Sequence, residues 1–502
     1  MFARLAVVVC VIWGMWAIVA PSRVTAESDD VRDSVVKIYT TQRRPNFARP
    51  WTKSTPREIS GTGAIIEGHR IITNAHVVLY ASRVMVQANQ SSRRVRAKVA
   101  AIAPEIDLAL LEVPSKSFFE GRPALPFAPD LPQLKETVNV YGFPIGGEQM
   151  SVTEGIVSRI EYTSYRYGTR GLRIQVDAAL NPGNSGGPAV IDGKIVGIVF
   201  SRISGADNIG YLIPVEEVDM FRRDVADGTY DGKPLLLDQM QTAENEALRE
   251  YLKLPADRGG MMITRPFEKD DSYPLKPNDV ILKIGSHAVD RQGRVEVRPG
   301  LRLSFQYMVP RTVKEGRVPL TIWRDGKELE VQAPVKRRYP RVVPYLRNSY
   351  PPYFIHGPIV FTVGTQELIA ALGTKAPLVF AARGNPLILR QFDRPKFEGE
   401  QLVVMGIQMF AHPIREGYSH QTLGVVTKVN DTEIRNLGHL VKTIHDAQGE
   451  FITLEIAGSY ERLVFRREEL LETTNEILED EGIRRQYSED LAPFWESGKS
   501  GG

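Results

Sequence analysis

The stretch that most constrains this chain is a serine enclosed by glycines at residues 181–188, Asn-Pro-Gly-Asn-Ser-Gly-Gly-Pro. An apolar run, an Asp-Gly pair and a second apolar run follow it, which is the pattern of a β-hairpin. Glycines let the backbone bend so that a serine hydroxyl projects and backbone N–H groups face one point. Ser185 is therefore a candidate nucleophile. The candidate oxyanion hole is Gly183, Asn184 and Ser185, with the N–H groups of Gly183 and Ser185 converging.

The same letters also satisfy the Gly-x-Ser-x-Gly elbow of α/β-hydrolases, and a glycine-rich turn with a surface serine would look similar. The order of the candidate partners separates these readings. His76 follows a strand–turn–strand pattern and Asp107 begins an apolar strand, so the order is histidine, acid, serine. An α/β-hydrolase would place its histidine last, but the first histidine after Ser185 is His287, in what reads as a separate module. The order predicts a trypsin-like double β-barrel.

Three blocks carry a more specific resemblance: Thr73-Asn74-Ala75-His76-Val77, Asp107-Leu108-Ala109-Leu110-Leu111 and Gly183-Asn184-Ser185-Gly186-Gly187-Pro188. They resemble the catalytic blocks of the HtrA/Deg family of serine proteases, and two PDZ-like segments downstream resemble its branch with two PDZ modules. The resemblance implies a catalytic triad of Ser185, His76 and Asp107 that needs no cofactor and no metal. It also implies unfolded or misfolded proteins as substrates, and a trimer or a multiple of trimers.

The fold we expect is mainly β, with the double barrel followed by two PDZ-like α+β modules. At 502 residues, about 150 per domain allows about three domains, and 42 glycines with 33 prolines favour many turns. The divisions are a signal peptide at 1–26, a protease domain at 27–230, a first PDZ module at 235–335, an ordered linker or insertion at 336–395, a second, divergent PDZ module at 396–475, and a charged helical tail at 476–502.

Residues 1–26 have a short basic start, an apolar run and small residues up to Ala26, which is typical of a secretory signal peptide. A retained anchor helix is the alternative. The only cysteine, Cys10, lies in this segment, so the cleaved chain would form no disulfide. We expect a periplasmic or secreted protein. With 63 basic and 60 acidic residues, charge gives no reason to expect nucleic acid as a partner.

The strand after the serine hairpin should line the primary specificity pocket with Ile198, Val199 and Phe200. Because these side chains are apolar and no acid accompanies them, we expect a shallow apolar pocket rather than one for Arg or Lys. Near the start of the domain, Phe47 and Trp51 lie in a proline-broken loop. In HtrA-like proteases aromatic residues near this end pack three subunits together, so these two are trimer candidates, although they could fold back on the barrel.

The first PDZ module offers a candidate site for C-terminal peptides at Arg258, Gly259, Gly260 and Met261. A glycine pair before an apolar strand can present N–H groups to a terminal carboxylate, and the arginine adds positive potential. An ordinary turn before a strand is the alternative.

In the second module, Glu398 and Glu400 lie at the matching loop, and we expect them to repel a carboxylate. The segment Arg159–Gly171 is rich in tyrosine and arginine and resembles the family's sensor loop, which would report peptide binding to the catalytic turn. A solvated polar loop is the alternative for this segment.

Two other classes of function remain open from the sequence. The barrel could hold polypeptides without cleaving them, as a protease-like chaperone, or it could be silent beside PDZ modules that act as a scaffold. The presence of all three catalytic residue types favours an active serine endopeptidase.

Overall fold

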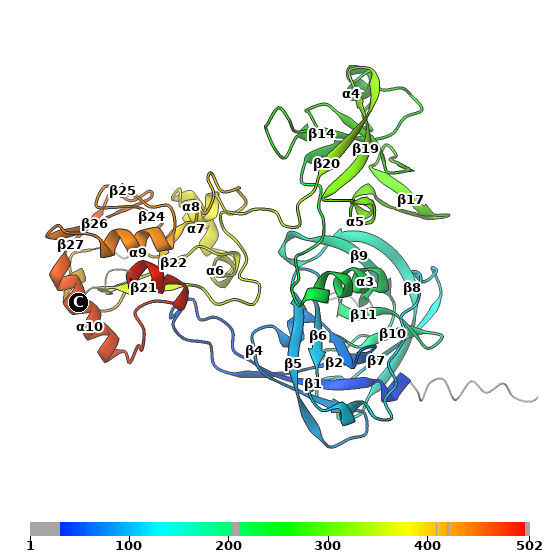
Figure 1. Cartoon of the computed structure of the whole chain (residues 1–502), viewed down its shortest axis with the longest axis horizontal. Helices are drawn as coiled ribbons and strands as arrows, with labels where there is room; N and C mark the ends of the chain where they lie inside the picture. Colours follow the sequence, from blue (N-terminus) through cyan, green and yellow to red (C-terminus); the bar gives the residue numbers. More distant parts are fainter. Residues whose placement is uncertain (1–30, 203–209, 408, 419–420, 497–502) are drawn as a thin grey trace, which may run out of the picture.

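The computed structural model describes residues 31–202, 210–407, 409–418 and 421–496. These form an N-terminal double-barrel domain, a first module and a second module (Figure 1). The predicted signal peptide at 1–26 lies outside the described residues. Within the described ranges, no helix combines the length and the apolar character that a membrane crossing requires.

Two closed barrels make up the N-terminal domain. The first contains β1 (Val35–Gln42), β2 (Arg57–Ile66), β3 (Arg70–Thr73), β4 (Ala81–Ala88), β5 (Arg94–Ala103) and β6 (Leu108–Glu112). The second contains β7 (Thr137–Gly142), β8 (Ser151–Ser164), β9 (Arg170–Val176), β10 (Pro188–Ile191), β11 (Lys194–Arg202) and β12 (Gly210–Pro214). Helix α2 (Ala75–Val78) lies in the first barrel and α3 (Val215–Asp224) follows the second. This architecture confirms the predicted double barrel.

Apolar side chains of the strands fill each barrel. In the first, Ile38, Ile71 and Leu111 belong to one cluster and are almost fully buried. In the second, Val138 and Leu172 belong to a cluster that continues into the first module. Burial of this apolar area is the main stabilising term, and it fixes the loops that emerge between the strands.

The first module is built on a six-stranded sheet in the order β13-β14-β15-β19-β20, with β16 beside β15. Its elements are β13 (Gln239–Thr242), α4 (Glu246–Tyr251), β14 (Met261–Arg265), β15 (Val280–Ile284), β16 (His287–Ala288), β17 (Arg294–Arg298), β18 (Leu301–Ser304), α5 (Val309–Thr312), β19 (Arg317–Arg324) and β20 (Lys327–Pro334). Strands β17 and β18 pair as a separate hairpin.

The second module contains two sheets, β21-β22-β23 and β25-β24-β26-β27. Its strands are β21 (Tyr353–His356), β22 (Ile359–Val363), β23 (Val403–Met405), β24 (Val426–Val429), β25 (Thr432–Glu433), β26 (Phe451–Ile456) and β27 (Arg462–Arg466). Its helices are α6 (Gln366–Ala371), α7 (Ala376–Ala382), α8 (Pro386–Leu389), α9 (Leu437–His445), α10 (Arg467–Asp480) and α11 (Ala492–Trp495).

The loop between β1 and β2 reaches the second module of the same chain (Figure 1). The Trp51 ring stacks on Phe410 at 5.6 Å between centroids, and it lies 6.2 Å from the ring of Tyr353. Phe47 packs on another apolar cluster of that module. Both rings are partly buried against the second module of the same chain, and their contribution to contacts between subunits stays a prediction.

Candidate active site

His76 and Asp107 are held together by two contacts. The backbone N–H of His76, in α2, donates to one carboxylate oxygen of Asp107 at 2.8 Å, and ring Nδ1 lies 2.6 Å from the other. Because an ionised carboxylate can only accept, Nδ1 carries the proton in this contact and Nε2 keeps a free lone pair. The Asp107 side chain is 4% exposed. The geometry suits His76 to act as a general base whose ring orientation Asp107 sets.

Asp107 lies in the turn between β5 and β6 and has a left-handed backbone, with φ 58°. A non-glycine residue adopts this conformation only when its surroundings hold it there. The side-chain amide of Asn74 donates to the Asp107 carbonyl at 3.0 Å, which supplies part of that support.

Ser185 lies in a turn that only glycines allow. A Cβ on Gly183 would meet the Phe143 carbonyl at 2.4 Å, and one on Gly186 would meet the Thr62 carbonyl at 2.2 Å. Both glycines also have positive φ, at 104° and 87°. The turn is anchored on β11, since the Gly186 N–H donates to the Val199 carbonyl at 2.9 Å.

The serine turn and the histidine helix face each other across β2. A Cβ on Gly61 would lie 2.8 Å from Val77, the residue after His76, and 3.3 Å from the carbonyl of Ser185. Among the described residues, the Ser185 hydroxyl makes no hydrogen bond to the His76 ring; such contacts often tighten only when substrate binds. The structure thus joins His76 to Asp107 directly and places the Ser185 turn beside the helix that carries His76.

Two backbone N–H groups of the turn are available as oxyanion donors. Within the described part of the chain, the N–H groups of Gly183 and Ser185 have no backbone acceptor. The Pro182 carbonyl accepts from Ile145 at 2.8 Å, and because the peptide is trans, the Gly183 N–H points the opposite way. Asn184 differs, since its N–H donates to the Asn181 carbonyl at 3.0 Å. Asn184 is therefore removed from the candidate donors.

The predicted pocket strand is buried in the barrel cores. Ile198, Val199 and Phe200 are 0%, 2% and 6% exposed, so their role as lining residues stays a prediction. The Phe200 ring lies 5.6 Å from that of Tyr165 and 4.6 Å from the Arg173 guanidinium. Burial raises the pKa of the Tyr165 phenol, so the hydroxyl stays neutral beside Phe200. No group of three or more metal-ligating side chains occurs in the described ranges.

Comparisons with known proteins identify the relatives of this chain. The model of a trypsin-like peptidase domain matches residues 61–198, and a PDZ domain model matches 342–490. Protease Do-like 2, chloroplastic, of Arabidopsis thaliana is 35% identical over 469 residues, 91% of this chain and 75% of that protein. Protease Do-like 4, mitochondrial, of the same plant is 35% identical over 442 residues, 87% of this chain and 82% of that protein. The chain belongs to the HtrA/Deg family.

As an HtrA/Deg protein, the chain is a serine-type endopeptidase, which confirms the enzyme class predicted from the sequence. Among solved structures, an HtrA-type protease, AlgW, with tripeptide is 24% identical, with a TM-score of 0.48, and covers 62% of this chain and 97% of its own. The PDZ match at 342–490 takes in most of the segment that we expected to be a linker and much of the expected tail.

Thr62 is a residue of the HtrA/Deg site that the sequence reading missed. Its hydroxyl donates to the Gly183 carbonyl at 2.8 Å and accepts the Phe143 N–H at 2.9 Å. Its own N–H donates to the Ser185 carbonyl at 2.9 Å. Thr62 is fully buried and so joins the first barrel to the serine turn of the second. A hydroxyl residue between two glycines, Gly61 and Gly63, was the available signal.

The predicted carboxylate site in the first module is closed. Strand β14, which begins at Met261, pairs with β13 on one side and with β15 on the other, so it has no edge for an added strand. The Gly260 N–H donates to the Asp290 carbonyl at 3.0 Å, and Arg258 pairs with Glu328 at 2.7 Å. Gly259 is packed, since a Cβ there would meet the Val289 carbonyl at 2.4 Å. The edge strands of this sheet order are β13 and β20, and β13 is the one beside β14.

In the second module, Glu400 is not available to repel a ligand. Arg390 binds both of its carboxylate oxygens, at 2.7 and 3.1 Å. Burial opposes ionisation of Glu400, but the hydrogen bonds from Arg390 and the Lys396 N–H outweigh it and lower its pKa. Glu398 remains exposed. The strand after this loop, β23, is an edge strand that pairs with β22 and makes the single bridge Val404–Val425 on its other side.

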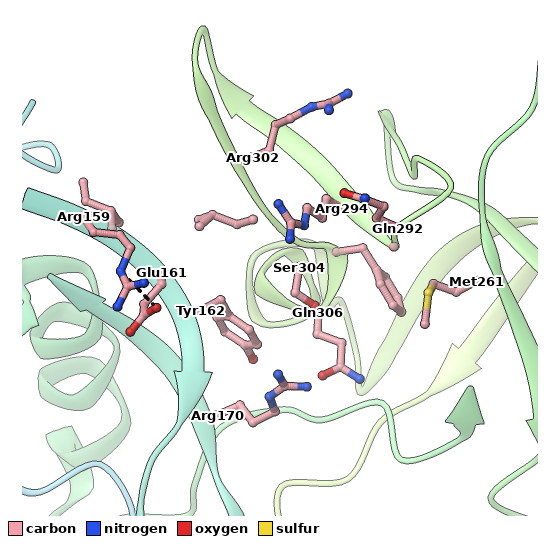
Figure 2. A pocket seen from close by; sticks show the side chains of 14 residues that line it. Arg159, Glu161, Tyr162, Arg170, Met261, Gln292, Arg294, Arg302, Ser304 and Gln306 are labelled. Atoms are coloured by element: carbon pink, nitrogen blue, oxygen red, sulfur yellow. Dashed lines mark ion pairs between the residues drawn. The ribbon is translucent and has the colours of Figure 1, made fainter. Parts of the chain in front are cut away.

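The Arg159–Gly171 hairpin lies between the protease domain and the first module. Its strand β8 lines a cavity of about 560 Å³ together with Met261 and the β17–β18 hairpin. Figure 2 shows Tyr162 and Arg170 facing Ser304 and Gln306 across this cavity. The Tyr162 ring is also 6.4 Å from that of Tyr307. This placement puts the predicted sensor segment in contact with the first module.

Proposed function

We propose that Ser185, His76 and Asp107 form the catalytic triad of an endopeptidase that cleaves unfolded or misfolded polypeptides. The observation that carries this proposal is the two-point contact between His76 and Asp107, beside the Ser185 turn. Such a contact is required when one imidazole must accept a proton and later donate it.

In this mechanism the Ser185 oxygen attacks the peptide carbonyl carbon while His76 Nε2 takes the hydroxyl proton. The negative oxygen of the tetrahedral intermediate is stabilised by the N–H groups of Gly183 and Ser185. His76 then protonates the leaving amine, the carbon–nitrogen bond breaks, and an acyl-enzyme remains. Water, deprotonated by His76, attacks the ester and releases the new C-terminus and the serine. Asp107 stabilises the imidazolium throughout and stays ionised.

The expected substrates follow from the apolar sequence of the strand at residues 198–200. We propose that the residue before the cleaved bond is small or medium aliphatic, such as valine or alanine. C-terminal peptides are proposed to bind the first module, at the β13 edge rather than at Arg258–Met261, and to regulate cleavage through the Arg159–Gly171 hairpin. Export with cleavage near Ala26 is proposed from the sequence pattern, and N-terminal sequencing of the purified protein tests it. A trimer or a multiple of trimers is proposed from the family resemblance.

Unfolded casein tests the proposed chemistry. Ser185→Ala should reduce hydrolysis by several orders of magnitude, since loss of a triad nucleophile removes most of the rate enhancement. The mutant should keep its melting temperature and still bind casein. Ser158→Ala, at an exposed serine of β8, is the matched control and should cleave like wild type. Hydrolysis by Ser185→Ala near the wild-type rate would end the triad assignment, and dominant cuts after Arg or Lys would end the pocket assignment.

If wild type binds casein and cleaves nothing under any peptide stimulus, the protease-like chaperone becomes the better reading.

A further inference from the structure

The segment that connects the two modules, residues 336–350, returns across the protease domain. The Arg337 side chain donates to the Gly232 carbonyl at 2.8 Å, and Arg338 donates to the Tyr230 carbonyl at 2.7 Å. The connection ends in two consecutive residues with left-handed backbone, Arg347 at φ 48° and Asn348 at φ 85°. We call this pair the linker turn. Two strained residues in succession indicate that the surrounding contacts hold them there.

The first residue of the linker turn binds the loop that carries Asp107. Arg347 Nε lies 2.5 Å from a carboxylate oxygen of Glu105, two residues before Asp107 in the β5–β6 turn. The Glu105 side chain is 5% exposed, and the second nearby cation, Arg338, is 3.7 Å away. The contact is an ion pair and is not aligned as a hydrogen bond. A buried carboxylate needs such a partner, so Arg347 fixes the position of the turn.

The second residue of the linker turn binds the loop that follows His76. The Asn348 side-chain oxygen accepts the Tyr80 N–H at 2.6 Å, just after helix α2. Tyr80 also has left-handed backbone, with φ 56°. Its ring lies 5.7 Å from that of Tyr350, whose hydroxyl donates to the Arg43 carbonyl at 2.7 Å. Neighbouring residues of one turn thus support both loops that present the histidine–acid pair.

We propose that Arg347 and Asn348 are positioning residues that hold Asp107 and His76 in the geometry for catalysis. The inference rests on the proposed triad. Neither side chain contacts the reacting atoms, and each acts through the loop that it binds. Displacement of a catalytic group by about 1 Å can cost about 100-fold in rate, so loosening either loop should reduce turnover rather than substrate binding.

The test measures kcat and KM of the full-length protein on a short, unstructured peptide. Arg347→Met and Glu105→Gln should each lower kcat about 10- to 100-fold with KM within about twofold. Because both substitutions break the same ion pair between Arg347 and Glu105, the kcat of the double variant should be little lower than that of either single variant. Arg347→Lys keeps the charge and should recover most of kcat. Asn348→Ala should lower kcat in the same way. The matched control is Arg337→Met, which breaks a contact of the same segment away from the triad and should leave kcat unchanged.

Labelling of Ser185 by a fluorophosphonate provides a second readout and should slow in parallel with kcat. Variants that melt like wild type and keep kcat within about twofold would overturn the proposal, as would an equal loss in Arg337→Met. If Arg347→Met does not fold, Asn348→Ala and Arg347→Lys, each compared with Arg337→Met, decide by the same criteria. Absence of Ser185-dependent hydrolysis in wild type would instead overturn the proposed function.

Discussion

Thr62 is the residue through which the two barrels meet at the catalytic turn. Its hydroxyl makes one bond as donor and one as acceptor, so Thr62→Val removes both while keeping the side-chain shape. Two buried backbone groups would then lack partners, at about 1–3 kcal/mol each. We expect kcat to fall about 10- to 100-fold, because the Gly183 carbonyl and with it the oxyanion turn lose their anchor. Steady-state kinetics on a short peptide check this expectation.

Two controls accompany that experiment. Thr62→Ser keeps the hydroxyl and should retain most of the activity. Thr40→Val removes a buried hydroxyl that has no hydrogen-bond partner among the described residues, and it should leave activity unchanged. Equal kinetics for Thr62→Val and wild type would show that the turn is held by its glycines alone.

His356 gives the second module a dependence on pH. Burial lowers the pKa of His356 from 6.5 to about 4, and neither ring nitrogen has a hydrogen-bond partner in the described structure. Between pH 6.5 and about pH 4, His356 binds a proton in the unfolded chain and not in the folded chain, so the stability of the folded state falls on acidification. The loss approaches roughly 3 kcal/mol near pH 4. Urea unfolding of the full-length protein near pH 7 and near pH 4.5 measures it.

His356→Leu should flatten this dependence, because leucine cannot take up the proton. His69→Asn, at an exposed position with φ 55°, is the control and should behave like wild type. An equal loss on acidification in wild type and His356→Leu would assign the effect to other groups.

Candidate residues could be predicted from the sequence where a local motif marks them. Residues that act through contacts with distant parts of the chain could not be predicted in this way. The blocks around His76, Asp107 and Ser185 each carry a recognisable pattern, and their order was enough to indicate the double barrel. Thr62 and Arg347 carry no such pattern, because their partners lie 121 residues away for Thr62 and in another domain for Arg347. Their roles depend on tertiary packing.

At the scale of elements, a local sequence pattern also failed to predict which strand of the first module could bind a peptide. Gly259 and Gly260 before an apolar strand have the local form of a carboxylate loop, but sheet order shows that β14 is an interior strand. Strand order is set by long-range pairing, which a local pattern does not contain. The edge strand β13 is short and polar, Gln-Met-Gln-Thr, so its sequence gave little indication that a strand begins there.

We therefore expect peptides with free apolar C-termini to add to β13 and not to the second module. Binding should slow amide hydrogen exchange at residues 235–242 of the intact chain. Exchange at β14 and β22 should not change, since both strands are already paired on two sides. Calorimetry with free and amidated peptides measures the affinity. Arg258→Glu is the control and should bind like wild type; a large loss in that variant would restore the original assignment.

At the scale of the whole molecule, Phe47 and Trp51 connect the loop between β1 and β2 with the second module. Trp51→Ala loses the stacking on Phe410 and the contact with Tyr353, so we expect a loss of about 1–3 kcal/mol in denaturant unfolding. The mass in solution, measured by light scattering, should stay that of a trimer or a multiple of trimers, because these rings contact the same chain. Tyr251→Ala, at a ring that is 72% exposed, is the control. Dissociation of the oligomer in Trp51→Ala alone would return this residue to the subunit interface.

The position of the linker turn in the sequence has a consequence for the time at which the enzyme becomes active. A ribosome makes the nucleophile at residue 185 long before it makes residues 347 and 348. A nascent or truncated chain that ends between these points holds every reacting group but lacks the support for two of them. Such a chain should be a slow enzyme until its synthesis passes the linker turn. The order of translation would then protect neighbouring unfolded chains, and the nascent chain itself, from premature cleavage.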